Sequence, residues 1–444
     1  MTERASNSLA DGKHTHATAD GLDLHLRPRS WFGTLGGPFA YRAFTTIWVA
    51  SLFANIGGSI QNVGAFWLMT SMAPTPAQVS LVQTASTLPI ALFALLSGVA
   101  ADAWDRRLVM LASQVLVCSV AVMLAVLCAT GQITPLALLV CTFVSGCGAA
   151  MFQPAWQSAV AEQVPRSELS AAIALDSFSL NFARTAGPAV GGLIVARLAP
   201  DVAFIVSGVS SAGLIYVLLR WRRRDADVKA PRAPRQGLLA SLMGGIRYCL
   251  GSHGIRSALL RSSLFGFLGS PVWALLPLFA KRQFGGEAGT YGILLGAFGA
   301  GAACGALGGA AMRARHHPEL VLRIFTLTFG LGALMTAWSP CKAVAMLGLA
   351  ISGASWVVVV STYNLAIQTA SPSWVAGRAL SLFHSCIVGG LAIGSFVWGM
   401  VATATTINAT FVISGLFMFV SMLLALRMPL PSPVPYDQCP EIAR

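Results

Sequence analysis

The stretch Gly98-Val-Ala-Ala-Asp102-Ala-Trp-Asp105-Arg106-Arg107 is short and charged, and it separates two long apolar runs, residues 77–101 and 108–129. Apolar runs of about 20 residues are long enough to cross the hydrocarbon core of a bilayer as helices. The stretch is therefore predicted to be a tight hairpin at a membrane edge. There Asp102 and Arg106, four residues apart, can hold each other and the end of a neighbouring helix.

Similar apolar runs follow one another along the whole chain. The 444 residues are 55% hydrophobic and 10% charged, with a mean hydropathy of +0.70, so charge is too scarce to cover a water-soluble domain. The expected fold is an all-α polytopic membrane protein. Twelve transmembrane helices are predicted, at residues 43–70, 77–101, 108–129, 135–160, 170–196, 202–221, 255–279, 288–311, 319–338, 343–369, 374–400 and 404–426.

The chain carries 29 Lys and Arg, and their positions follow the predicted helix order. Nearly all lie in the two tails or in the loops after helices 2, 4, 6, 8 and 10. The exceptions are Arg197, Lys281, Arg282 and Lys342 on the other side, and Arg184 within a helix. Because cytoplasmic loops are enriched in Lys and Arg, both termini are predicted to be cytoplasmic. Basic residues spread over separate loops argue against a nucleic-acid partner.

A polar, Arg-rich segment with two prolines, residues 222–236, divides the predicted helices into six and six. Glycine, arginine and proline positions repeat between the halves at a constant offset, as in Gly98 with Gly305. Parallel six-helix repeats place a binding site between two bundles near the middle of the membrane. The predicted division is a disordered cytoplasmic tail (1–38), an N-terminal bundle (39–221), a cytoplasmic linker with an amphipathic helix (222–252), a C-terminal bundle (253–428) and a cytoplasmic tail (429–444).

The opening stretch resembles the loop between helices 2 and 3 of major facilitator superfamily transporters, whose pattern is G-x-L-A-D-R-x-G-R-R. Gly98, Asp102, Arg106 and Arg107 match this pattern. Ala103 and Asp105 depart from it. Asp in place of the second Gly of the pattern is, however, common in the subfamily of enterobactin-type siderophore exporters and macrolide efflux pumps.

Three further motifs resemble the same subfamily and occur in its order: F-x-P-A from Phe152, V-P-R-x-x-L from Val164 and R-x-x-G-P-x-x-G-G from Arg184. The last also resembles the helix-5 signature of the superfamily's antiporters. The resemblance covers nearly the whole chain. It implies a secondary transporter that works by alternating access.

The resemblance favours a gating role for the hairpin. Asp102 is expected to cap the positive N-terminus of helix 11, near Ser373, and Arg106 to meet Glu162 at the end of helix 4. These contacts would close the cytoplasmic side and break when the cavity opens inward. The alternative is a solvated loop that merely follows topology. The predicted gating residues are Gly98, Asp102, Arg106, Arg107 and Glu162.

Small residues in predicted helix 5 form a smooth stripe, because Ala183, Gly187 and Gly191 are spaced by four. Pro188 bends the helix beside them, and Gly192 follows. A similar stripe in helix 8 runs through Gly292, Gly296, Ala300, Cys304 and Gly308. Helices 5 and 8 are therefore expected to pack across the boundary between the halves and to slide or rock there. The alternative is ordinary packing in one fixed state.

Three of the ionisable groups inside predicted helices are candidate site residues. Arg184 is near the middle of helix 5, where a charge costs roughly 2.5–3.5 kcal/mol on insertion scales. A water-filled cavity is the preferred explanation, with substrate or coupling contact as its role and a structural anchor as the alternative. His384 in helix 11 can carry a coupling proton or pack as a neutral side chain. Asp176 is a rival proton site, although the subfamily usually has Asn there.

Uncharged polar side chains also share helix faces. Buried amides need partners, so they either bond between helices or line a substrate path. An aromatic and amide cavity suits an amphipathic organic solute better than an inorganic ion. The residues are Asn55, Ser59 and Asn62 in helix 1, Gln153 and Gln157 in helix 4, and Asn364 and Gln368 in helix 10.

The sequence thus predicts an exporter of a small amphipathic organic molecule, a siderophore or hydrophobic drug, coupled to proton entry. A proton-coupled importer or lipid flippase of the same fold is the first alternative, and a non-transporting membrane sensor the second. No ATP-binding, catalytic, cofactor or metal-site motif is found, so the protein is not expected to be an enzyme. The excess of Arg over Lys suggests a GC-rich bacterial genome, hence the bacterial cytoplasmic (inner) membrane, with the lipid bilayer, solute and protons as partners.

Overall fold

The computed structural model describes residues 37–431 except residues 74, 104 and 222–237, and these residues form helices and short connections only. After a short 3₁₀ turn, η3 (Gly37–Ala40), the N-terminal half holds α2 (Arg42–Met72), α3 (Pro76–Ala103), α4 (Arg106–Ala129), α5 (Pro135–Gln163), α6 (Leu169–Arg197) and α7 (Pro200–Arg220). The C-terminal half holds α8 (Leu238–Gly251), α9 (His253–Ala274), α10 (Leu276–Phe284), α11 (Ala288–Arg315), α12 (Pro318–Ala337), α13 (Lys342–Ala370), α14 (Ser373–Ala404) and α15 (Ile407–Arg427).

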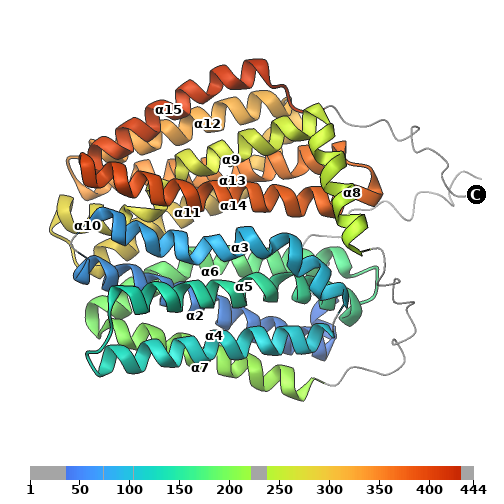
Figure 1. The fold of residues 1–444 in the computed structure, drawn as a ribbon, viewed down its shortest axis with the longest axis horizontal. Helices are drawn as coiled ribbons and strands as arrows, with labels where there is room; N and C mark the ends of the chain where they lie inside the picture. Colours follow the sequence, from blue (N-terminus) through green and yellow to red (C-terminus); the bar gives the residue numbers. More distant parts are fainter. Residues whose placement is uncertain (1–36, 74, 104, 222–237, 432–444) are drawn as a thin grey trace, which may run out of the picture.

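The long helices lie side by side in two bundles, one from each half of the chain (Figure 1). With α9 and α10 taken as one bent element, the described part of each half has six long helices, as predicted. By length and hydropathy alone, eight described helices suit a membrane span, and the α9–α10 pair makes a ninth. Helix α6 is not among them, and it is the helix that carries Asp176, Asn181 and Arg184.

One predicted helix differs from the structure. The sequence predicts an unbroken helix at residues 255–279, whereas the structure breaks it at Leu275 and bends the two pieces by 42°. Pro277 in the first turn of α10 explains the break, because proline cannot donate the hydrogen bond that would continue α9. Most of the two predicted tails (1–36 and 432–444) and residues 222–237 of the predicted linker lie outside the described residues.

Alternating helix directions give the molecule two faces. We call the face with the α3–α4, α5–α6, α11–α12 and α13–α14 connections the basic face, and the other the opposite face. Both ends of the described chain lie on the basic face: Gly37 adjoins Glu168 at the start of α6, and Pro431 adjoins Gly254 at the start of α9.

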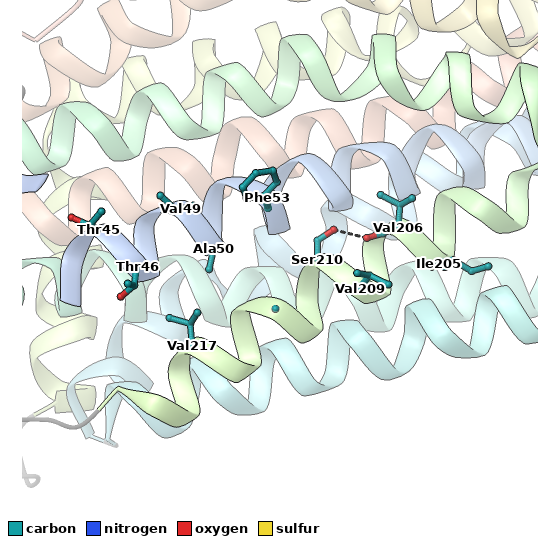
Figure 2. Close-up of a pocket in the computed structure, with 11 residues that line it drawn as sticks. Thr45, Thr46, Val49, Ala50, Phe53, Ile205, Val206, Val209, Ser210 and Val217 are labelled. Atoms are coloured by element: carbon teal, nitrogen blue, oxygen red, sulfur yellow. Dashed lines mark hydrogen bonds between the residues drawn. The ribbon is translucent and has the colours of Figure 1, made fainter. Parts of the chain in front are cut away.

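Local signals set the helix ends on these faces. Asp105 caps α4, because its carboxylate accepts a hydrogen bond of 2.9 Å from the Arg107 backbone N–H. Thr134 caps α5 in the same manner. In the N-terminal bundle, α2 and α7 run antiparallel, and a groove follows their outer side (Figure 2).

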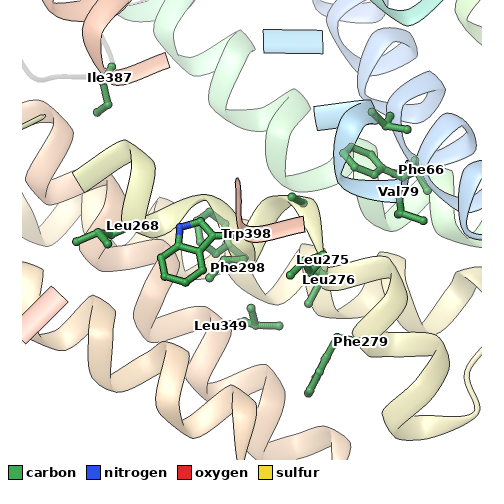
Figure 3. Close-up of a cluster of buried hydrophobic side chains, with 14 of the residues drawn as sticks. Phe66, Val79, Leu268, Leu275, Leu276, Phe279, Phe298, Leu349, Ile387 and Trp398 are labelled. Atoms are coloured by element: carbon green, nitrogen blue, oxygen red, sulfur yellow. The ribbon is translucent and has the colours of Figure 1, made fainter. Parts of the chain in front are cut away.

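The hydrophobic core is not evenly divided between the halves. A large buried cluster joins both of them near the opposite face, with Phe66 and Val79 from the N-terminal half and Phe279, Phe298 and Trp398 from the C-terminal half (Figure 3). A smaller cluster, around Phe44, Trp156 and Leu218, lies wholly within the N-terminal half. The shared core holds the two bundles together at the opposite-face end.

Candidate site: a polar cleft between the two halves

Helices α6 and α11 cross the boundary between the halves at very close range. A Cβ atom added to Gly192 would lie 2.6 Å from the Cα of Gly292, and one added to Gly299 would lie 2.7 Å from the Cα of Thr185. Backbones approach this closely only where side chains are absent. The predicted packing of these two helices is confirmed.

The stripe that makes this contact is not the predicted one. Gly187 faces Ser59 and Gly191 faces Ile60, so both pack against α2 inside the N-terminal half. The contact with α11 comes from the next face of α6, through Thr185, Pro188 and Gly192. Helical spacing marks both faces as smooth, and it does not reveal which neighbour each face meets.

The second contact between the halves joins α3 and α14. The Thr84 hydroxyl donates to the Ala392 carbonyl at 3.0 Å, and the Ala77 backbone N–H donates to the Thr403 hydroxyl at 3.0 Å. Lys281 of α10 also donates to the Thr70 carbonyl at the end of α2, at 3.2 Å. All of these residues lie in the opposite-face halves of their helices. The bundles are therefore closed toward the opposite face.

Toward the basic face the same helices are more accessible. Ala303, Ala306 and Ala310 continue the face of α11 that meets α6, because they lie within about 40° of Gly292 around the helix, and all three are exposed. On α6, Ser177 and Asn181 are exposed as well. These surfaces indicate a cleft between the halves that opens on the basic face. The predicted stripe residues Cys304 and Gly308 lie about 120–160° around α11 from Gly292, on the side that carries the exposed side chains of Ile293 and Leu307.

Arg184 and His384 lie at the inner end of this cleft, one on each half. Arg184 is about 22 Å from the start of α6 and His384 about 16 Å from the start of α14, so the two are at similar depth. Both are ionisable groups with exposed side chains in the middle part of a helix. This combination fits residues that face a cavity rather than lipid.

The predicted amide residues divide into two groups. Asn62, Gln157 and Gln368 have exposed side chains. Asn55 and Asn364 are half-buried, and the Asn55 amide donates weakly to the Ser179 hydroxyl of α6 at 3.4 Å. Asn364 and Gln157, which correspond in the repeat, both lie six residues from the basic-face ends of their helices. Amides are thus placed at several depths between the basic face and the opposite-face seal.

Asp176 lies apart from the cleft, in the packed interior of the N-terminal half. It is buried, and its carboxylate accepts hydrogen bonds from the Trp156 indole at 2.7 Å and from the Gln153 amide at 3.2 Å. The structure therefore brings Gln153 and Asp176 together with each other. It does not bring either of them to Arg184 or His384.

The charged hairpin makes contacts within the N-terminal half. Arg106 bonds to the Glu162 carboxylate, as predicted, and to the Ser158 carbonyl at 3.2 Å. Arg107 donates to the carbonyls of Leu218 and Leu219, at 2.9 and 2.8 Å, which end α7. Arginine is favoured there because the last carbonyls of a helix carry partial negative charge.

The remaining part of the predicted gate is not described in side-chain detail. Gly98 and Asp102 belong to the last turns of α3 and Ser373 begins α14. The side chain of Asp102 and that of Ser373 lie outside the described residues, so the predicted cap between them stays a prediction.

Sequence reasoning missed one ionic cluster in the C-terminal half. Arg261 of α9 is buried and binds the Glu319 carboxylate with both terminal nitrogens, each at 3.0 Å. It also donates to the Met428 carbonyl at 2.9 Å, and its guanidinium lies 5.9 Å from the Tyr363 ring centroid. Arg323 adds a contact of 3.2 Å to Glu319. The sequence did contain a signal for this cluster: Arg261 lies inside a predicted span, and Glu319 is the first residue of another.

Comparison with known proteins gives consistent matches over the same region. Residues 34–442 match the family described as transmembrane secretion effector. The multidrug efflux pump Tap of Mycobacterium tuberculosis is 26% identical over 388 residues, covering 86% of this chain and 92% of Tap. The enterobactin exporter EntS of Citrobacter koseri is 26% identical over 425 residues, covering 92% of this chain and 99% of EntS.

Solved transporter structures have the same fold. A bacterial homologue of the human lysosomal transporter Spinster, in an inward-facing and occupied conformation, superposes with a TM-score of 0.73 at 13% identity, over 90% of this chain and 99% of that one. The nucleoside transporter NupG gives 0.65 at 14% identity, over 87% of this chain and 99% of that one. The predicted two-bundle fold is confirmed.

Proposed function

The chain belongs to the transmembrane secretion effector family of the major facilitator superfamily, and on that premise we propose that it exports a small amphipathic organic molecule by alternating access, in exchange for protons. It is a multi-pass membrane transporter and not an enzyme. The observation that carries the proposal is the pair Arg184 and His384, accessible at mid-span on opposite halves that are sealed on one side only.

The chemistry of the cleft supports an amphipathic organic solute. Arg184 offers a cation, and Asn62, Gln157 and Gln368 offer amide donors and acceptors at different depths. Helix faces rich in alanine and glycine supply apolar surface between them. Sites for organic ligands combine such apolar walls with a few convergent polar groups. The solute would contact both halves at once.

Alternating access is supported by the face of α11 that meets α6. Near the opposite face Gly292 and Gly299 already pack against α6, while Ala303, Ala306 and Ala310, further along the same face, have small, exposed side chains. Rocking of one bundle on the other would bring this part against α6 and separate Gly192 from Gly292. The smooth surface lets the contact form without reshaping side chains.

In this proposal the hairpin acts as a latch for the basic face. Arg106 with Glu162, and Arg107 with the end of α7, hold the hairpin rigidly on the N-terminal bundle. Asp102 would then cap the N-terminus of α14 when the cleft closes. Its partner would be a helix end rather than an acidic or basic side chain.

His384 is our candidate for the coupling proton, because it is an exposed imidazole at a depth similar to that of Arg184. In this proposal a proton on His384 and the solute occupy the inner end of the cleft in turn. Asp176 is the second candidate. A proton there would change its hydrogen bonds with Trp156 and Gln153 and so affect the packing of α5 on α6.

The membrane orientation follows from charge. We propose that the basic face and both termini are cytoplasmic, in a bacterial cytoplasmic membrane, because Lys and Arg are concentrated there. In that orientation the cleft opens inward, where an exporter collects its solute. The named functions of Tap and EntS, a multidrug efflux pump and an enterobactin exporter, agree with outward transport.

The test is a panel of drugs and siderophores assayed for efflux from cells that express the chain, with and without a proton uncoupler. We expect efflux of at least one amphipathic compound that stops with the uncoupler and with Arg184→Gln. Arg184→Lys is the matched control that keeps the charge. Uptake into energised right-side-out vesicles would favour an importer, movement of labelled lipid a flippase, and binding without flux a sensor. Each of these results would refute export.

A further inference from the structure

A second cavity lies outside the cleft, on the outer side of the N-terminal bundle. It is a groove of about 700 Å³ between the basic-face half of α2 and residues 205–217 of α7, and it includes Val49 and Phe53 on one wall and Val209 and Val217 on the other (Figure 2). Along α7 it runs from Ile205 to Val217, a length of about 18 Å. The hydrocarbon of one bilayer leaflet is about 15 Å thick.

The lining is apolar even where the residue types are polar. The Thr46 hydroxyl donates to the Arg42 carbonyl at 2.9 Å, and the Thr45 hydroxyl donates to the Tyr41 carbonyl at 3.1 Å. Ser210 donates to the carbonyl of Val206, as Figure 2 shows. Each hydroxyl is thus satisfied by its own helix, so the groove is suited to a hydrocarbon chain.

The depth of the groove comes from a missing side chain. A Cβ added to Gly213 would meet nothing within 4 Å, and Ala50 lines the facing wall. The Cβ of a larger residue at position 213 would enter this space without a clash. The groove can therefore be closed by substitution while the helices keep their packing.

The end of the groove at the basic face is cationic. Arg42 is the first residue of α2, one turn before Thr46, and Arg220 is the last residue of α7, one turn after Val217. Both are exposed, and Arg220 lies 5.1 Å from the ring centroid of Tyr216, an aromatic residue of the kind that marks the membrane interface. Arg107 adds positive charge at the end of α7, and Asp105 is the acidic residue nearest to it in sequence.

The groove does not belong to the solute path. Successive residues of a helix are rotated by about 100°, so Val49 and Phe53 point away from the face of α2 that carries Asn55 and Asn62. A solute in the cleft would touch the face of α2 that carries Asn55 and Asn62. Only a molecule in the bilayer would reach the face that carries Val49 and Phe53.

We propose that this groove binds an anionic phospholipid of the leaflet at the basic face. One acyl chain lies between α2 and α7 over Gly213, and the phosphate group lies between Arg42 and Arg220. The apolar length selects a lipid chain, and the two arginines select a negative headgroup.

The test uses the purified full-length protein and native mass spectrometry with two lipids of identical chains, dioleoyl phosphatidylglycerol and dioleoyl phosphatidylcholine. We expect phosphatidylglycerol to be retained about tenfold more strongly, since each arginine near a headgroup favours an anionic lipid. Gly213→Leu should lower retention of phosphatidylglycerol about tenfold, because it displaces about two methylenes. Gly308→Leu also adds a leucine to open space, on α11, and should leave retention unchanged.

A double variant, Arg42→Gln with Arg220→Gln, tests the headgroup contact separately and should abolish the difference between the two lipids. Equal retention of both lipids by the unmodified protein would overturn the proposal. So would full retention in Gly213→Leu, or a preference that survives loss of both arginines. A dimer that Gly213→Leu separates, with lipid retention unchanged, would assign the groove to a second copy of the chain instead.

Discussion

Adding one methyl group at Gly292 should shift the transporter away from the conformation described above. The Cβ of Gly292→Ala would lie 2.7 Å from the Gly192 Cα and 2.8 Å from the Pro188 carbonyl oxygen, both backbone atoms that cannot rotate away. Overpacking of this kind typically costs about 1–3 kcal/mol. This free energy destabilises the state that is sealed at the opposite face. It corresponds to a change of about five- to 150-fold in the population ratio of this state to the state open at the opposite face.

An Ala303→Cys variant in a background without other cysteines reports this shift, because Ala303 is exposed on the side of α11 that meets α6. Gly292→Ala should slow labelling of that cysteine by a maleimide, by up to the same factor as the change in the population ratio. Gly289→Ala is the matched control: it lies on the same helix at the same seal, but its Cβ would be 3.5 Å from the Ala196 Cβ, an ordinary contact. Unchanged labelling in Gly292→Ala, or equal slowing in Gly289→Ala, would refute the reasoning.

Three further outcomes are expected. Arg184→Gln should abolish efflux while Arg184→Lys keeps part of it, measured with the same compound; equal activity of the two variants would remove the cation from the mechanism. Arg106→Ala should slow efflux about tenfold with little change in Tm, because the partly exposed pair with Glu162 contributes about 1 kcal/mol or less; a large fall in Tm would make the contact structural. Arg261→Met should lower Tm by several degrees, because breaking a buried pair costs about 3–5 kcal/mol and Glu319 then keeps, among the described residues, the ion pair with Arg323; an unchanged Tm would show that the pair does not stabilise the C-terminal half.

Much of the fold can be predicted from features of the individual helices and loops. The length of each apolar run predicts a span, and the alternation of basic and non-basic loops predicts that every second connection lies on the same face of the membrane. The contact between Arg106 and Glu162 could be predicted because both residues end neighbouring helices at one surface, where few positions are within reach. The close approach of α6 and α11 followed from small residues, which have few other uses in a lipid-facing helix.

Features that depend on the rotation of one helix against another could not be predicted in this way. Helical spacing grouped Gly187 with Gly191, but Gly192, one residue further, makes the contact between the halves. Asp176 was predicted only as a rival proton site, and its partners Trp156 and Gln153 could not be predicted, because they come from α5 and periodicity within α6 carries no information about them. Arg261 and Glu319 are far apart in sequence, so only the packing of α9 on α12 brings them together.

The most direct test of alternating access is a pair of distances measured by double electron–electron resonance in the reconstituted protein. One pair of spin labels, at Ser170 and Arg315, spans the basic-face ends of α6 and α11, and the other, at Leu198 and Glu287, spans their opposite-face ends. When a transported compound and a pH gradient are supplied, the basic-face distance should shorten while the opposite-face distance lengthens. If both distances stay fixed, or both change in the same direction, the two bundles do not rock about a central cleft and the account is wrong.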